Sequence, residues 1–424
     1  MRSLTIFLVL ATSVLGDKAS FENYKVFRII PDDEDQVQLL RELEDTDQGF
    51  TYWRGPTRAS QPVDVMVAPD QLDDFAALMN FTGINRYETF VSNVQRLIER
   101  ENPSTREGGF GWKRYHNLDE IYSWMESLAA QNPGKVKLLA PGRTYQGRQI
   151  KGVKLSLSKD GTEKPGIFVE GGIHAREWIS PATVTYLINQ LLTSEDSQVQ
   201  ELAQSYDWYM FPSFNPDGYV HTHTSNRMWR KTLSRSGLFC KGADANRNWG
   251  FKWMSGGASS NPCSDTYAGS RAFSEIETRT MSEYLKSIGD KLFAYIAFHS
   301  YSQLLLFPYG HTREHLDNHD ESLAIGTEAI GALSKRYGTK YITGNIAETI
   351  YVASGSSMDW AKANIKVPVA FTYELRDKGN NGFILPADQI IPNGEEILDS
   401  FVALFRKAGE FGYPVTKKQT NKGI

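Results

Sequence analysis

The pattern of apolar and polar residues divides the larger, C-terminal part of the chain into alternating predicted strands and helices. Short continuous apolar runs bounded by turn residues are typical of strands that are buried on both faces. Apolar residues three or four positions apart predict helices with one buried face. In chain order we expect a helix over 119–130, a strand over 165–170, a helix capped by Ser180-Pro181, a helix over 274–288, a strand over 292–298, a helix over 321–337 and a strand over 367–373. This alternation predicts an α/β domain with a mixed, largely parallel twisted sheet flanked by helices.

A second, smaller pattern precedes this domain. Strands are predicted over 21–30, weakly near Tyr52, and over 63–67 and 84–90, and helices begin at Pro31 and Pro69. Proline suits the first turn of a helix because the N–H that it lacks would have no partner there. The resulting order β-α-β-β-α-β predicts a small α+β domain of the ferredoxin-like type.

A polar stretch over 99–114 joins the two patterns. Its proline, paired glycines and four basic residues predict an exposed linker, and exposed linkers are where proteases cut. We expect a trypsin-like protease to cut after Arg106. The alternative is an ordinary interdomain linker that stays intact.

Residues 1–16 have the features of a secretory signal peptide. Arg2 supplies the basic start, and the apolar run over 4–14 is shorter than the roughly 20 residues that span a bilayer. The alternative is a buried first strand. Secretion implies an oxidising compartment, which favours a disulfide between Cys240 and Cys263, the only two cysteines of the chain.

Charge and composition argue against two classes of partner, nucleic acids and membranes, and exclude little else. Residues 17–106 carry 17 acidic and 10 basic residues, whereas the rest of the chain is nearly neutral and the total is −4. Neither this charge nor any later apolar segment gives a reason to expect nucleic acid or a membrane as a partner. Asn80 begins an N-glycosylation sequon, a motif too short to show that the site is used.

Side chains suited to zinc follow three of the predicted strands. His174 and Glu177 lie in the glycine-rich turn after the first, His299 follows the second and Glu374 follows the third. Because ligands bind at the carboxyl ends of strands in open α/β sheets, these residues are expected at one edge. Two imidazoles and a carboxylate make a catalytic zinc site that leaves one position for water. The alternative is a capped turn in which Arg176 makes a surface salt bridge.

From Tyr115 to about Tyr413 the chain resembles the zinc metallocarboxypeptidases of the pancreatic A/B type, and the preceding segment resembles their activation domain. The resemblance rests on long motifs in a fixed order: Gly-Gly-Ile-His174-Ala-Arg-Glu177-Trp, Asn226-Arg-Met-Trp-Arg230-Lys, Gly242-Ala-Asp-Ala-Asn246-Arg247-Asn-Trp, His299-Ser-Tyr-Ser-Gln, Ile350-Tyr351-Val-Ala-Ser-Gly and Thr372-Tyr-Glu374-Leu-Arg. It implies a signal peptide over 1–16, an activation domain with its connecting segment over 17–106 and a catalytic domain over 107–424. It also implies a monomer that is secreted, into a digestive lumen, and that acts on peptides with a free C-terminal carboxylate.

The resemblance assigns roles to individual residues. It implies one Zn²⁺ held by His174, Glu177 and His299, with Glu374 as general base and Arg230 as the partner of the oxyanion. Asp244 would orient the first histidine, and Cys240 and Cys263 match a disulfide of the family. The residues that would contact substrate are Arg176, Asn246, Arg247, Ser300, Tyr301, Tyr351, Met358 and Phe383.

The pocket for the last side chain of the substrate has Met358 at its floor in this resemblance. A neutral, flexible methionine favours apolar or aromatic C-terminal residues. Ser356 stands where the family pattern has glycine and is expected to narrow or polarise the pocket. The other matching wall positions are Leu306, Ile346, Ala353 and Thr372.

Two rival functions are a carboxypeptidase of basic specificity, with an acid elsewhere in its pocket, and an inactive relative that only binds peptides. The second is disfavoured because no zinc or base position is substituted. Three further histidines, His311, His315 and His319, would form one stripe if they lay on a helix. Their polar surroundings predict a surface segment rather than a metal site.

Overall fold

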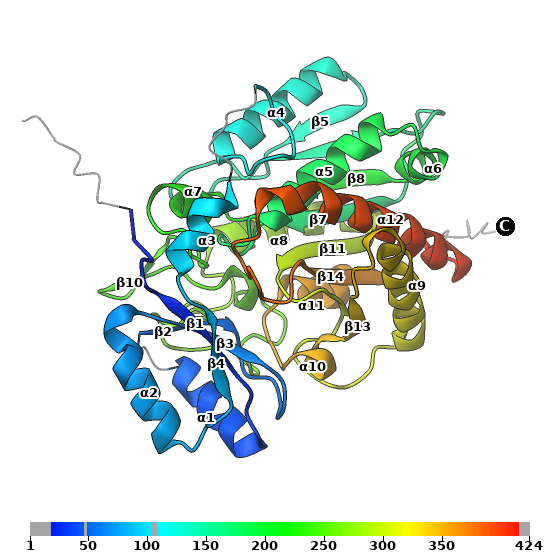
Figure 1. Cartoon of the computed structure of the whole chain (residues 1–424). Coiled ribbons are helices and arrows are strands. Elements are labelled where there is room, and N and C mark those ends of the chain that lie inside the picture. The colour runs from blue at the N-terminus through cyan, green and yellow to red at the C-terminus, as the bar shows by residue number, and fades with distance from the viewer. Residues whose placement is uncertain (1–17, 46–48, 103–107, 415–424) are drawn as a thin grey trace, which may run out of the picture.

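The computed structural model describes residues 18–45, 49–102 and 108–414, which form two domains in contact (Figure 1). The predicted signal peptide and Arg106 lie outside the described residues. No helix in the described part of the chain is both long and apolar enough to cross a membrane.

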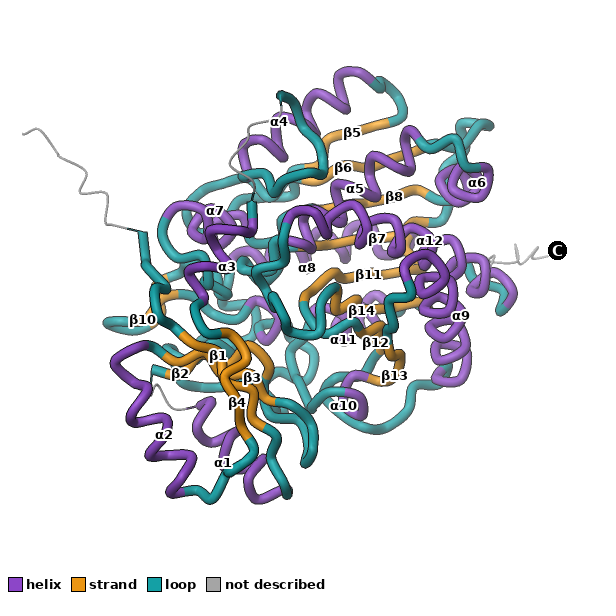
Figure 2. Tube along the Cα trace, viewed as in Figure 1, coloured by secondary structure: helices purple, strands orange, loops and turns teal. Residues whose placement is uncertain are grey.

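The larger domain is built on one eight-stranded mixed sheet, which confirms the predicted α/β class (Figure 2). Its four central strands are parallel: β8 Asp207–Phe211, β7 Gly166–Gly171, β11 Leu292–Ser300 and β14 Val369–Leu375. Beyond β8 lie β6 Gly152–Ser156 and β5 Val136–Leu139, and beyond β14 lie β12 Leu304–Phe307 and β13 Ile342–Asn345. The central strands are almost wholly buried, which explains why their sequences are continuously apolar.

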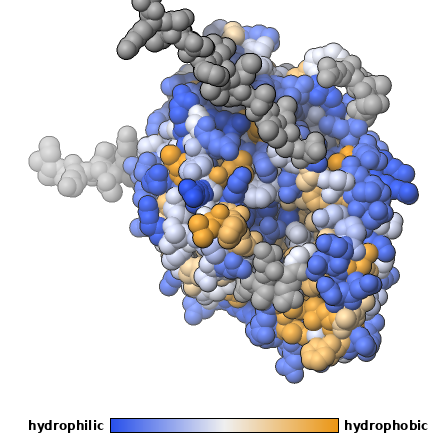
Figure 3. Space-filling model, turned by 90° about the vertical axis from the view of Figure 1, so that its left-hand side faces the viewer, coloured by the Kyte–Doolittle hydropathy of each residue, from blue (hydrophilic) through white to orange (hydrophobic). Residues whose placement is uncertain are grey.

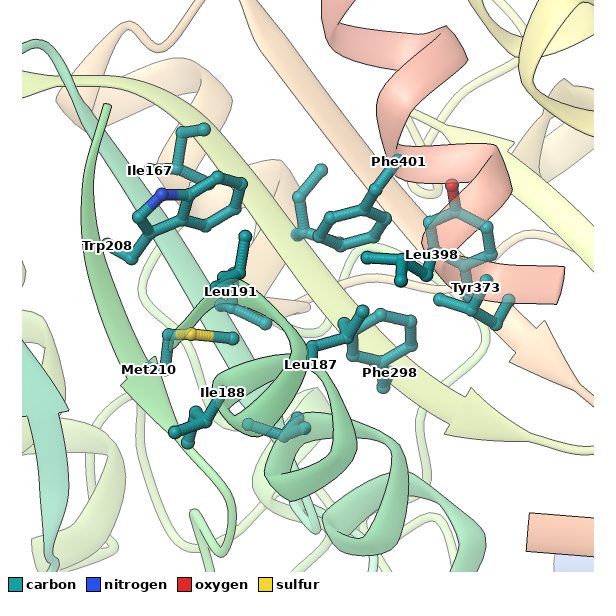
Figure 4. Packing of buried hydrophobic residues seen from close by; sticks show 14 of the residues in the cluster. Ile167, Leu187, Ile188, Leu191, Trp208, Met210, Phe298, Tyr373, Leu398 and Phe401 are labelled. Atoms are coloured by element: carbon teal, nitrogen blue, oxygen red, sulfur yellow. The ribbon is translucent and has the colours of Figure 1, made fainter. Parts of the chain in front are cut away.

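Two hydrophobic clusters cover the two faces of this sheet. Successive residues of β11 belong to different clusters, since Tyr295 and Ala297 pack on one face and Ile296 and Phe298 on the other. On the second of these faces Trp208 and Phe298 lie close to Leu191 of one helix and Phe401 of another (Figure 4). The helices of this face include α4 Leu118–Gln131, α5 Ile179–Thr193, α6 Ser197–Ser205, α7 Pro216–Thr224, α9 His319–Tyr337 and α12 Ile390–Glu410, whereas α8 Ile276–Ile288 and the short α11 Ser357–Trp360 lie on the opposite face.

The smaller domain has the predicted β-α-β-β-α-β order. Its antiparallel sheet has the strand order β2-β3-β1-β4, and α1 and α2 cover one face. The elements are β1 Lys25–Ile29, α1 Glu34–Asp45, β2 Phe50–Arg54, β3 Val63–Val67, α2 Leu72–Phe81 and β4 Tyr87–Val91. Its other face packs on the larger domain, because Trp53 and Met66 share a hydrophobic cluster with Tyr301 and Phe383.

The expectation of an exposed linker over 99–114 was wrong at both ends. Residues 99–101 finish α3 Val94–Glu101, and Glu101 is buried. The buried carboxylate is paired with Arg227, whose Nε donates to Oε2 at 2.7 Å. The Arg227 guanidinium in turn lies 3.9 Å from the ring centroid of Trp178. Phe110 and Trp112 also pack against the core of the larger domain, so both ends of the connection are fixed.

Two local expectations also need correction. Ser180 does not cap α5, which starts after Trp178 without a side-chain cap; its hydroxyl instead accepts from the N–H of Gly172 at 2.8 Å. The C-terminal helix α12 was not predicted, although its buried side chains dominate one face of the sheet.

The disulfide between Cys240 and Cys263 is present, as both the compartment and the resemblance implied. It joins the hairpin of β9 Arg235–Ser236 and β10 Cys240–Lys241 to a neighbouring loop. The side of the molecule that carries this hairpin, on the left in Figure 1, is largely hydrophilic, with hydrophobic residues in a few separate patches (Figure 3).

The buried pair of Glu101 and Arg227 gives a stability prediction. Glu101→Gln should lower the free energy of unfolding of the full chain by about 3 kcal/mol, because it leaves the Arg227 charge buried without its partner. Asp399→Asn is the matched control, since Asp399 pairs with Arg336 on the exposed surface and its loss should cost no more than about 1 kcal/mol. Urea denaturation measures both, and equal losses would contradict the prediction.

Candidate metal centre and the cavity around it

Three neighbouring parallel strands bring the predicted zinc ligands and base to one edge of the sheet. His299 and Glu374 are register partners in the pairing of β11 with β14. β7 pairs with the other side of β11 and leads into the turn that carries His174. At the start of this turn Gly172 has φ of 68°, and a side chain there would meet the carbonyl of Pro212 at 3.2 Å. The hydroxyl of Ser180 fixes both ends of the turn, since it also donates to the carbonyl of Glu177 at 3.0 Å.

His174, Glu177 and His299 are buried, with one ligand atom of each within 4.8 Å of the others. Nδ1 of His174 lies 2.8 Å from the carboxylate of Glu177 and 3.1 Å from Nδ1 of His299. Two ring nitrogens this close cannot both present lone pairs to each other without repulsion, and a shared cation removes that conflict. Two imidazoles and one carboxylate are the donor set of a catalytic zinc site, so these residues fit the metal.

The charges around this group support its role as a cation site. Burial opposes the charge of Glu177, but the two histidines hold its pKa well below the ordinary value. Burial lowers the pKa of His299, and the Glu177 carboxylate outweighs this and raises it. Glu177 therefore stays ionised in the buried centre, as a metal ligand must.

Asp244 links the ligand group to Arg230. Its Oδ1 lies 3.1 Å from Nε2 of His174, which leaves Nδ1 of that ring for a metal. Its Oδ2 accepts from Nη2 of Arg230 at 2.6 Å. Burial opposes ionisation of Asp244, yet Arg230, His174 and Arg247 keep its pKa well below its ordinary value. A fixed carboxylate thus orients both a ligand and a cationic side chain that lines the cavity.

Glu374 stands beside the ligand group without belonging to it. Its enclosed position, together with the nearby charge of Glu177, raises the pKa of Glu374 to about 8 despite the attraction of His299. A divalent cation at the ligand group would lower this pKa and favour the carboxylate form. A carboxyl tuned in this way suits proton transfer near neutral pH.

These residues line a cavity of about 580 Å³. On one side lie Arg247, whose Nε donates to the carbonyl of Gly257 at 2.8 Å, and Tyr351, whose hydroxyl lies 3.4 Å from Nη2 of Arg247. Asn246 lines the same side and accepts from the N–H of Ser357 through its side-chain oxygen at 2.9 Å. The cavity therefore offers a guanidinium and amide and hydroxyl groups together, which suits a carboxylate ligand.

One part of the cavity wall is apolar. Met358 is buried there, and its sulfur accepts from the hydroxyl of Thr372 at 3.4 Å. The hydroxyl of Ser356 accepts from the N–H of Asp359, so it caps α11. The other predicted wall residues, Leu306, Ile346, Ala353 and Thr372, also line the cavity.

The smaller domain closes the cavity on one side and contacts three of the predicted substrate-binding residues. Tyr301 donates its hydroxyl to Asp64 of β3 at 2.9 Å, and Nη2 of Arg176 donates to the carbonyl of Tyr52 at 3.3 Å. The ring of Phe383 packs edge-on against Trp53 at 5.7 Å. Ser300, also predicted, lines the cavity, and its N–H lies 3.2 Å from the Glu177 carboxylate.

Sequence reasoning missed two acidic residues that organise this region. Asp64 is buried between the domains and also accepts from Nε of Arg28 at 2.7 Å. Glu170 lies inside the apolar β7 and accepts from the hydroxyl of Tyr295 at 2.6 Å and from that of Ser357 at 2.9 Å. Each of the two could have been noticed in the sequence, because it is an acidic residue within a predicted strand that is otherwise apolar.

The three histidines do not form a stripe on one helix. The helix α9 begins only at His319, and the residues before it form a loop. His311 is held by Asp359, with Nδ1 at 3.0 Å from the carboxylate. His315 and His319 instead lie together near Glu348.

Comparison with known proteins gives a consistent result. A family model described as zinc carboxypeptidase matches residues 121–400, and one described as carboxypeptidase activation peptide matches 27–101. Zinc carboxypeptidase A 1 of Anopheles gambiae is 48% identical over 413 residues, covering 96% of this chain and 94% of the relative. Carboxypeptidase A1 of Homo sapiens is 39% identical over 408 residues, covering 93% and 96%.

Solved structures show the same architecture. The crystal structure of thrombin activatable fibrinolysis inhibitor has a TM-score of 0.82 at 31% identity and covers 91% of this chain and 98% of that one. Carboxypeptidase A from Helicoverpa armigera has a TM-score of 0.82 at 27% identity, covering 92% and 98%.

Proposed function

This chain belongs to the zinc carboxypeptidase family and carries that family's activation peptide, and from this premise we propose that it is a secreted digestive zymogen of A-type specificity. Activation would follow a trypsin-like cut after Arg106, which separates 17–106 from a monomeric catalytic domain over 107–424. The observation that carries the specificity is the apolar floor at Met358.

The reaction proposed is hydrolysis of the C-terminal peptide bond. His174, Glu177 and His299 would hold one Zn²⁺, which when bound supplies a Lewis acid for the scissile carbonyl and for water. Glu374 takes a proton from the attacking water and delivers it to the leaving amine. Arg230, held by Asp244, donates to the oxygen that gains negative charge.

Recognition of the substrate's end would use the opposite side of the cavity. Arg247, Asn246 and Tyr351 bind the terminal carboxylate, for which a planar guanidinium is well shaped. The last side chain enters the apolar part above Met358. Arg176, Ser300, Tyr301 and Phe383 would contact the preceding residues of the peptide.

The pocket argues against basic specificity. Among the described residues, the acidic side chains that line the cavity are Glu177, Glu348 and Glu374. Asp359 follows Met358 in the chain, but its carboxylate accepts from the N–H groups of Gly310 and His311. The cavity floor thus has no free acid to pair with a C-terminal lysine or arginine.

Glu374→Gln tests the base directly. The variant should keep its zinc but lose at least about a hundredfold in kcat on a C-terminal Phe peptide, because glutamine cannot accept a proton. Metal content and peptide release after activation measure the two properties, and wild-type protein treated with a chelator shows the effect of removing zinc alone. Normal turnover by the variant would remove Glu374 from the mechanism.

Specificity is tested with peptides that end in Phe or Arg. The activated enzyme should prefer Phe by at least about a hundredfold in kcat/KM, since an unpaired charge in an apolar pocket is costly. Met358→Asp should reduce or invert this ratio, whereas Met254→Asp, on the surface, should leave it unchanged. A preference of the unaltered enzyme for Arg would refute the A-type specificity.

The zymogen proposal predicts that the full chain is nearly inactive on peptides until it is cut. Trypsin should release activity, and Arg106→Gln should slow that release more than Arg100→Gln does, because Arg100 lies within α3. Full activity before any cleavage would show that the first domain is not an inhibitor.

A further inference from the structure

A second group of metal-binding side chains lies on the surface of the larger domain, where α9 begins. His315 comes from the loop before α9, His319 is the first residue of α9, and Glu348 comes from α10 Ile346–Thr349. One ligand atom of each lies within 4.8 Å of the others, and in the described part of the chain only the catalytic group is comparable. Nε2 of His315 is 3.3 Å from Oε1 of Glu348.

The two imidazoles lie against each other, and one ring must turn for both to share an ion, because the in-plane lone pairs of parallel rings do not meet at one point. Their rings stack with centroids 3.7 Å apart and planes 4° apart. A neutral imidazole is the form that binds metals.

The electrostatic surroundings also favour a cation. Asp320 and Glu321 occupy the first turn of α9, and the carboxylate of Asp320 lies 3.2 Å from Nδ1 of His319. These acids offset the positive end of the helix dipole. Glu348 and Asp320 thus each place a carboxylate beside one of the two rings.

We propose that His315, His319 and Glu348 bind a divalent transition-metal ion, with Zn²⁺ as the ion of choice. Two nitrogens and one oxygen match the ligands of zinc, whereas Ca²⁺ and Mg²⁺ take oxygen ligands. The side chain of His315 is 55% exposed and that of Glu348 is 42% exposed, so both can turn toward an ion and water can complete its coordination. This site is separate from the catalytic one and does not depend on the proposed specificity.

An ion at this position would connect the surface to the wall of the catalytic cavity. Glu348 itself lines the cavity, as do Ile346, Ile350 and Tyr351 on the same short segment. The ion would join this segment to the start of α9. The consequence is a restraint on the part of the wall that carries Tyr351.

The test uses the full chain with its catalytic site already filled by one equivalent of Zn²⁺. Calorimetric titration with further Zn²⁺ at neutral pH should reveal a second, weaker equivalent. Glu348→Gln and His315→Asn should each weaken the second equivalent at least about tenfold while the first is retained. Glu314→Gln is the matched control, because Glu314 lies in the same loop outside the group, and it should bind like the unaltered chain.

Hydrogen exchange gives an independent readout. Backbone amides of 346–351 should exchange more slowly once the second equivalent is bound, and this slowing should be absent in Glu348→Gln. A chain that binds a single zinc would overturn the proposal. So would a second equivalent that persists unchanged in both variants, since it would then occupy another place.

Discussion

The parallel pairing of β7, β11 and β14 is the constraint on which the chemistry of this protein depends. Its register sets His299 directly opposite Glu374, and the strand on the other side delivers the turn with His174 and Glu177. Parallel strands end at the same edge, so residues 200 positions apart in the chain (374 − 174) meet without any long loop. The buried apolar side chains on both faces of the sheet hold that register, and they therefore also fix the relative positions of the site residues.

The proposed inhibition by the smaller domain would follow from which groups this domain contacts. Its Asp64 accepts from the hydroxyl of Tyr301, and its Tyr52 carbonyl accepts from Arg176. Its Trp53 packs against Phe383. The ligand group, Glu374 and Met358 remain as cavity walls. In the proposed zymogen the domain would therefore block the approach of a peptide and leave the reacting groups in place. The Glu101–Arg227 pair anchors the far end of the same domain in the body.

The sequence predicts those structural elements that a single local pattern of apolar residues determines. The continuous apolar runs located β7, β11 and β14, and the order of elements identified both domains. Contacts between residues far apart in the chain cannot be predicted in this way. Nothing near Glu101 indicates that Arg227 lies opposite, and the local pattern alone predicts an exposed position. The same holds for Asp64 and Tyr301, which are 237 residues apart. The motifs supplied the candidate site, because residue spacing alone left a salt-bridged turn as an alternative.

The complete arrangement of ligands, base and carboxylate-binding residues within the uncut chain has a kinetic consequence. Since these side chains are already together, the proposed activation would need no folding step after the cut. It would need only that Asp64 and Glu101 lose their partners and regain water, and that the two domains part along the surface around Trp53. The delay between cleavage and activity would then be a dissociation time, set by how tightly the severed domain is held. A severed domain that stays bound would act as a reversible inhibitor of the catalytic domain.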